Sequence, residues 1–144
     1  MVTLKIPSRF TIAIHILACV HYFQEEFPVT SEFLAGSIGV NAVIVRQILL
    51  MLKRAGMLRI MKGRGGIYLA KDVDDITLYD VFDAVEAVDG ELFRFHETPN
   101  PECPVGKKIH EALDDNLNKI QTALYDKMKQ IKISDITAIT EKKG

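Results

Sequence analysis

The chain has 144 residues, 48% of them hydrophobic and 26% charged, with a formal net charge of −1. This composition is typical of one globular domain with a sizeable core. It excludes disordered, collagen-like and disulfide-framework proteins, since only Cys19 and Cys103 are present. No apolar run reaches 18 residues, and no small-residue cleavage site follows the short run at residues 12–20. We therefore expect a cytoplasmic protein without a membrane partner.

The first 40 residues predict two helices of different kinds. Residues 9–24 are apolar on almost every side, which indicates a helix buried against several neighbours. Thr30 then offers a hydroxyl to cap a second, shorter helix. Gly39 ends that helix, because glycine readily adopts the left-handed conformation found at helix C-termini.

Asn41 caps a third expected helix, residues 42–55, which has one buried and one outward face. The buried stripe recurs at helical spacing and consists of Val45, Ile48, Leu49 and Leu52. On the opposite face, Arg46 and Gln47 point outward near the N-terminal end, and such side chains can read base edges in the major groove. Many small helical domains contain a similar pair, so this feature alone is only moderately specific for DNA binding.

A basic, glycine-rich hairpin follows this helix. Two short β-like runs, residues 57–61 and 67–70, are joined by Lys-Gly-Arg-Gly-Gly at residues 62–66, where three glycines permit positive φ angles. Residues 41–71 hold seven basic side chains and no acidic one, whereas residues 72–102 hold ten acids and one base. A basic helix beside a basic hairpin is typical of a winged helix-turn-helix that faces DNA. The loop lacks the spacing of a nucleotide-binding phosphate loop.

The C-terminal half predicts a long helix that associates with a second copy. Thr77 and Asp80 resemble a capping box for a helix that runs to about residue 88, and a loop follows. Residues 107–132 then form one helix. Its apolar positions, three or four residues apart, are Ile109, Leu113, Leu117, Ile120, Leu124, Met128 and Ile131. Such a near-heptad seam is typical of paired helices, and we expect it to be the dimerisation surface.

The expected fold class is mainly α with a small β-hairpin: a winged helix-turn-helix with a long C-terminal dimerisation helix. We divide the chain into a DNA-binding domain at residues 1–88, a loop at residues 89–106 and a dimerisation part at residues 107–144. In this last part, a short helix capped by Ser134 follows the long helix.

The segment from Leu52 to Ala70, LKRAGMLRIMKGRGGIYLA, resembles the helix end and wing of the Rrf family of winged-helix transcriptional regulators, the IscR, NsrR and CymR type. Residues 30–41, 75–86 and 133–136 are also similar, so the resemblance covers nearly the whole chain. It implies a dimeric repressor or activator that binds double-stranded DNA. By position, it implies base-reading roles for Asn41, Ala42, Arg46 and Gln47 and wing contacts for Lys62, Gly63 and Arg64. Expected phosphate contacts are Arg9, Thr30 and Lys53.

The loop at residues 89–106 departs from the pattern of family members that sense iron, nitric oxide or redox state. Those members hold an Fe–S cluster through three cysteines in this loop, whereas this chain has Cys103 alone, with His96 and Glu97 as weak substitutes. We therefore expect no cofactor and no metal ligand. Cys103 is either a redox-active thiol, activated by the start of the long helix, or a small buried residue of a rigid loop.

These features predict a homodimeric, sequence-specific transcriptional regulator that acts as a repressor on a palindromic operator. One alternative is a winged-helix protein-interaction module without DNA binding. Another is a regulator that senses redox state through Cys103. A small enzyme is disfavoured, because no nucleophile–base set or paired carboxylates are evident, and we assign no catalytic residue. An unidentified effector or regulatory protein is a further expected partner.

Overall fold

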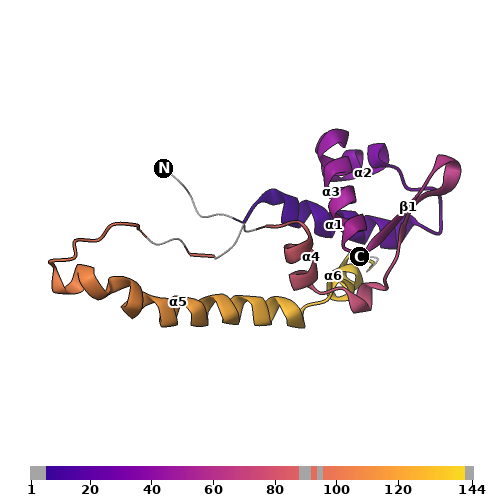
Figure 1. Ribbon diagram of the computed structural model, residues 1–144. Coiled ribbons are helices and arrows are strands. Elements are labelled where there is room, and N and C mark those ends of the chain that lie inside the picture. Colours follow the sequence, from indigo (N-terminus) through magenta and orange to yellow (C-terminus); the bar gives the residue numbers. More distant parts are fainter. Residues whose placement is uncertain (1–5, 88–91, 94–95, 142–144) are drawn as a thin grey trace.

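The computed structural model describes residues 6–87, 92–93 and 96–141. Within these residues it contains six α-helices, a two-stranded antiparallel sheet and two 3-10 turns. In chain order the elements are α1 (Ser8–Phe23), α2 (Ser31–Ile38), α3 (Ala42–Arg54), β1 (Leu58–Met61), η1 (Gly63–Gly65), β2 (Gly66–Leu69), η2 (Val73–Asp75), α4 (Leu78–Ala84), α5 (Pro104–Gln130) and α6 (Ile133–Thr140). Figure 1 divides them into a winged-helix body, made of every element except α5, and an arm, α5, which projects from the body. The expected fold class is confirmed.

Two side-chain caps define the helix-turn-helix. The hydroxyl of Thr30 accepts a hydrogen bond from the N–H of Phe33 at 3.1 Å, and Oδ1 of Asn41 accepts one from the N–H of Ile44 at 2.9 Å. Between them, Gly39 ends α2 with a φ of 84°. The two helices consequently meet at 111°. The capping predictions for Thr30, Gly39 and Asn41 are confirmed.

The hairpin β1–β2 forms a wing whose base is tied to the body. The N–H of Ile67 donates to the carbonyl oxygen of Val29 at 3.0 Å, and the N–H of Leu69 donates to Oε1 of Gln24 at 3.0 Å. A glycine is required at position 66, because its φ is 77° and a Cβ there would lie 3.0 Å from the backbone N of Val29. The predicted hairpin is confirmed, and its connection is the 3-10 turn η1.

Helix α1 is the centre of the body and contacts α2, α3, α4, α6 and β2. Its Ala13, Ile16, Leu17 and Val20 are fully buried, which confirms the prediction of a helix covered on several sides. The surrounding elements complete the core with the fully buried Leu34, Val45, Leu52, Ile76, Val81, Val85 and Ile133. Burial of each such side chain contributes roughly 1.5–3 kcal/mol. A single chain therefore provides the body with a closed core.

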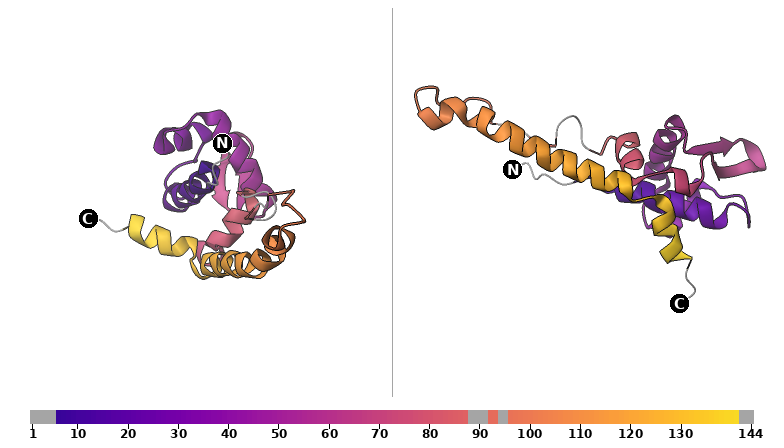
Figure 2. Two further views of the ribbon diagram at one scale, coloured as in Figure 1. Left: turned by 90° about the vertical axis from the view of Figure 1, so that its left-hand side faces the viewer. Right: turned by 90° about the horizontal axis from the view of Figure 1, so that it is seen from below.

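The arm leaves the body at its own C-terminal end and extends well beyond it (Figures 1 and 2). At 27 residues, α5 is about 40 Å long. Two backbone hydrogen bonds of 2.8 Å anchor its end, from the N–H of Leu78 to Ile131 O and from the N–H of Ile133 to Ile76 O. Of the expected dimerisation residues, Met128 is 8% exposed and belongs to the core, and Leu124 packs against that core. Met128 is therefore covered within one chain, and Leu124 is partly covered.

Several predicted boundaries were wrong. Helix α5 begins at Pro104 rather than Lys107, because proline fits the first position of a helix. It ends at Gln130 rather than at residue 132. Helix α4 ends at Ala84, and residue 88 lies outside the described residues. Helix α6 begins at Ile133, ahead of the expected cap Ser134, and it packs on α1 within the body.

Among the described residues, no single helix is long and apolar enough to cross a membrane. The pair α2 and α3 has the required length and composition, but the two helices are bent by 111° and form the helix-turn-helix.

Candidate nucleic-acid interface

The outward face of α3 is accessible and mixes polar with apolar side chains. Val43 is 58% exposed, Leu50 is 48% exposed, and 53% of the Arg46 side chain is exposed. Gln47 is exposed beside them. Because a helix turns about 100° per residue, these four positions share one face, opposite the buried stripe. The structure therefore brings together Arg46 and Gln47, two of the four expected base-reading residues.

The other two expected base-reading residues, Asn41 and Ala42, lie at the start of α3. Oδ1 of Asn41 is engaged in the cap hydrogen bond to the N–H of Ile44. Ala42 is half-buried and offers no polar side-chain atom. Their base-reading roles remain predictions, and Arg46 and Gln47 are the better-placed pair.

Arg46 has an acidic partner that sequence reasoning missed. Its Nη2 lies 2.9 Å from Oε1 of Glu32 on the first turn of α2, and both side chains are more than half exposed. The pKa of Glu32 is held below its ordinary value by its own backbone N–H first, then by Arg46 and Ser31. An ion pair this exposed adds little stability, so its main consequence is to orient the Arg46 guanidinium. No local pattern signals the pair, because its members are 14 positions apart on different helices.

An apolar groove separates α3 from the wing. It has a volume of about 660 Å³ and lies between the start of α2, the outward side of α3 and the hairpin. Its apolar walls include Leu49, Leu50, Ile60, Met61 and Ile67, and its polar side chains include Thr30, Glu32 and Arg46. The helix and the wing are thus two separate protrusions with a depression between them.

The wing presents the expected Lys62 and Gly63 beside this groove, and Gly63 is one of the residues that line it. Lys62 is exposed, and Gly63 has a φ of 75°, a conformation that glycine adopts without strain. The backbone of Arg64 lies within η1, and its side chain lies outside the described part of the structure. Of the two expected wing cations, Lys62 is therefore the one whose side chain the structure describes.

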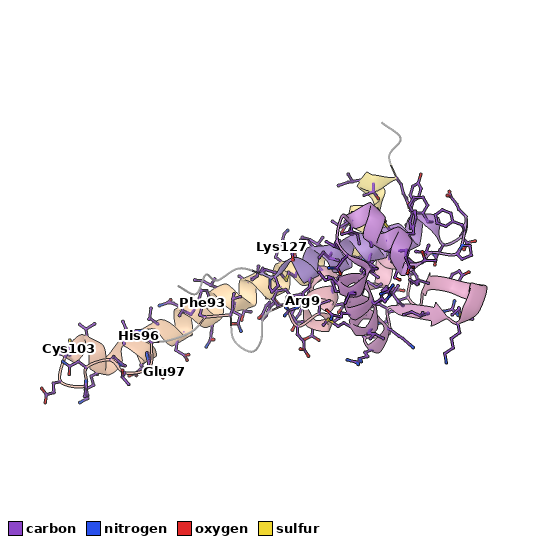
Figure 3. All side chains as sticks on the ribbon, turned by 90° about the horizontal axis from the view of Figure 1, so that it is seen from above. Arg9, Phe93, His96, Glu97, Cys103 and Lys127 are labelled. Carbon is purple, nitrogen blue, oxygen red and sulfur yellow. The ribbon has the colours of Figure 1, made fainter. Side chains whose placement is uncertain are left out.

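The three expected phosphate contacts lie in different places. Lys53 is exposed on the last turn of α3, and Thr30 lines the groove while its hydroxyl caps α2. Arg9, in contrast, donates from Nε to the carbonyl oxygen of Val85 at 2.6 Å and from Nη2 to that of Glu86. Figure 3 places Arg9 where the arm meets the body, on the opposite side from the wing. The structure therefore groups Lys53 and Thr30 with α3 but not Arg9.

This helix-turn-helix with its wing matches a known family. A model of the Rrf2 family, described as an iron-dependent transcriptional regulator, matches residues 6–139. The chain belongs to the Rrf2 family. It is 40% identical over 131 residues to the "Putative HTH-type transcriptional regulator YwnA" of Bacillus subtilis (strain 168), and the match covers 91% of this chain and 96% of that protein.

Solved structures agree with the Rrf2 assignment. A crystal structure of a "putative DNA binding protein" is 36% identical, with a TM-score of 0.70, and the match covers 90% of this chain and 98% of that one. CymR of B. subtilis, described as the global cysteine regulator, has the same fold, with a TM-score of 0.70 at 18% identity over 96% of this chain and all of CymR. The family resemblance seen in the sequence is confirmed.

The loop ahead of the arm does not fit the iron site that the Rrf2 description implies. Cys103 lies at the far end of the arm, away from the body (Figure 3), and its exposed thiol is free. The backbone N–H groups of Gly106 and then Val105 lower the pKa of this thiol. Nearby, a ring nitrogen of His110 lies 2.7 Å from the carbonyl oxygen of His96. Within the described residues, no group of three His, Cys, Asp or Glu side chains could hold a metal ion.

Proposed function

We propose that this Rrf2-family protein binds a specific DNA sequence as a homodimer and represses transcription. The observation that carries the proposal is the outward face of α3, where Arg46 and Gln47 stand exposed on a helix-turn-helix. A helix in this position enters the major groove and presents its N-terminal residues to base edges. Arginine can form two hydrogen bonds with guanine, and glutamine can form two with adenine. The pair can therefore distinguish one base pair from another.

The end of α3 and the wing supply the phosphate contacts of this proposal. Lys53, Arg54 and Lys62 are all exposed, and residues 41–71 contain no acid. The acid beside this surface is Glu32 of α2, which is paired with Arg46. Each cation that neutralises a phosphate releases condensed counterions. The affinity for DNA should therefore fall by roughly one power of the salt concentration for each such contact.

The arm supports assembly with a second copy. Ile109, Leu113 and Leu117 are only half-buried, and Ile120 is 53% exposed, so this stretch of the seam is incompletely covered within one chain. Soluble monomers seldom leave a long apolar stripe bare, and a near-heptad seam packs well against a second helix. A twofold dimer would present two copies of α3 to one duplex. A palindromic operator follows from that symmetry.

Selection of binding sites from random duplex DNA by the full chain tests the proposal. At an ionic strength of about 0.15 M, we expect an inverted repeat whose half-sites lie roughly one helical turn apart. Sedimentation should find two copies of the chain on each site. As a control, the Arg46→Ala, Gln47→Ala double variant should keep weak, salt-sensitive DNA binding and lose the selected sequence.

A promoter that carries the selected site tests repression. Expression from it should fall when the wild-type chain is present and should not change with the double variant. If selection enriches no sequence, DNA recognition is refuted and the protein-interaction module becomes the better assignment. If expression rises instead, the protein is an activator.

A further inference from the structure

Val43 is an apolar side chain that lies exposed in the first turn of α3. At 58%, it is the most exposed large apolar side chain of the helix-turn-helix and wing, as far as the structure describes them. It lies outside the hydrophobic core. Valine is also a weaker helix former than alanine, so helix propensity gives no reason for it in the first turn of α3.

The position of Val43 on α3 places it between the two expected base-reading side chains. At about 100° per residue, Arg46 lies about 60° to one side of Val43 and Gln47 about 40° to the other. Leu50 shares this face but lines the groove toward the wing, which Val43 does not. Val43 is therefore the centre of the α3 face that would enter the major groove.

The first turn of α3 offers no better candidate for base contact. The carboxamide oxygen of Asn41 is engaged by the N–H of Ile44, and Ala42 is half-buried. The apolar side chain of Ile44 is 38% exposed, less than that of Val43. An apolar side chain cannot satisfy a phosphate or a hydrogen-bonding base edge. The apolar group that a base presents in the major groove is the C5-methyl of thymine.

We propose that Val43 is a specificity-determining residue that reads one thymine in each half-site by packing against its methyl group. This inference rests on the proposed DNA-binding function. The same contact acts against the other bases. Cytosine presents an amino group without a methyl, and the polar edges of adenine and guanine would lose water against valine without gaining a hydrogen bond.

The test removes the methyl group from the DNA and the valine side chain from the protein, separately and together. Each thymine of a selected site is replaced in turn by deoxyuridine, which lacks only the C5-methyl. For the wild-type chain, we expect one position per half-site where this replacement weakens binding about fourfold, and about fifteenfold when both half-sites are changed. The Val43→Ala variant should bind the thymine and uracil sites with nearly equal affinity.

Two controls separate readout from folding. Val43→Ala should unfold at the wild-type temperature or slightly above it, because the side chain is exposed and alanine favours helices. Val105→Ala removes another exposed valine, which is 67% exposed at the N-terminal end of α5, far from the body. This variant should keep the full sensitivity to deoxyuridine. Renewed site selection with Val43→Ala should relax the preference for thymine at that one position.

The outcomes distinguish this inference from the function on which it rests. If specific sites are selected but no thymine is sensitive to loss of its methyl, the role of Val43 is refuted and DNA recognition stands. If replacing thymine by deoxyuridine weakens binding equally in the wild-type chain and in Val43→Ala, the role of Val43 is also refuted and DNA recognition stands. If no sequence is selected at all, both proposals fail together.

Discussion

The body and the arm contain the same kinds of apolar side chain, but the chain covers them to different extents. In the body, Ile16 and Leu52 are essentially inaccessible to water. Along the arm, Leu117 is half-buried and Ile120 is 53% exposed, and only at the base does a seam residue, Met128, enter the core. One chain therefore suffices to fold the body, whereas the arm has an apolar surface that a second chain would cover.

Placing charge on the arm should disrupt the proposed dimer. In the Leu113→Glu, Leu117→Glu double variant, each carboxylate would be buried without a partner twice per dimer, so we expect the dimer dissociation constant to rise at least 100-fold, about 3 kcal/mol. Analytical ultracentrifugation measures this. Leu124 is left unchanged because it packs against the core of its own chain.

The matched control adds the same charges at exposed polar positions of the arm. The Asn118→Glu, Thr122→Glu variant should dimerise as the wild-type chain does, since both exposed positions lie on the side of α5 away from the seam. A Leu113→Glu, Leu117→Glu variant that still forms dimers at wild-type concentrations would show that the interface lies elsewhere.

Truncation of one core residue and one arm residue should sharpen the comparison. Leu52→Ala should lower the free energy of unfolding by about 2–5 kcal/mol at any protein concentration, because it leaves a cavity in the closed core of the body. Ile120→Ala should act through the dimer alone, so that its effect on the midpoint of thermal unfolding depends on protein concentration. Equal, concentration-independent losses for both variants would contradict the division into body and arm.

Within the body, replacing Arg46 and replacing Lys62 should affect DNA binding in different ways. Arg46→Ala should weaken binding to the selected site by about 1–3 kcal/mol and binding to random DNA by less, because a base contact is lost. Lys62→Ala should weaken both more evenly and reduce the salt slope by about one unit, as expected for a phosphate contact. Equal losses on selected and random DNA for Arg46→Ala would mean that another residue reads the bases.

The smallest expected effect concerns Cys103 at the far end of the arm. The N–H groups of Gly106 and Val105 favour its thiolate, so its pKa is lower in the folded than in the unfolded chain. Its alkylation rate should therefore reach half its maximum at a lower pH in the native protein than in urea. The buried Cys19 should react only after unfolding. Identical pH profiles in the two states would remove the basis for a thiol-sensing role.

Features fixed by neighbouring residues were predictable from the sequence, and features fixed by distant ones were not. The caps at Thr30 and Asn41 join atoms three residues apart, so local chemistry identifies them. The end of α4 involves Arg9, whose guanidinium binds carbonyl oxygens 76 and 77 positions away. Glu86 adopts a positive φ of 49° at that point, which its residue type does not favour.

The arm and the candidate interface were predictable from the sequence to the same limited extent. The apolar period of the seam correctly predicts a long helix, but it does not reveal which neighbour covers each position, so Met128 could not be assigned to the core. At the interface, the sequence placed Arg46 on the outward face of α3. Its pairing with Glu32 depends on the angle between two helices, which no spacing along the chain encodes.

The ties at the base of the wing have a consequence for the length of DNA that each half of the proposed dimer occupies. The bonds from Ile67 to Val29 and from Leu69 to Gln24 join the wing to the same body that contains α3. The distance between α3 and the wing is therefore set by the fold of the body. If one base pair were inserted between the DNA contacts of α3 and those of the wing, the segment contacted by the wing would move by about 3.4 Å along the duplex and rotate around it. If the protein binds DNA as proposed, we expect the spacing within a half-site to be fixed and the spacing between half-sites to depend on the geometry of the arm.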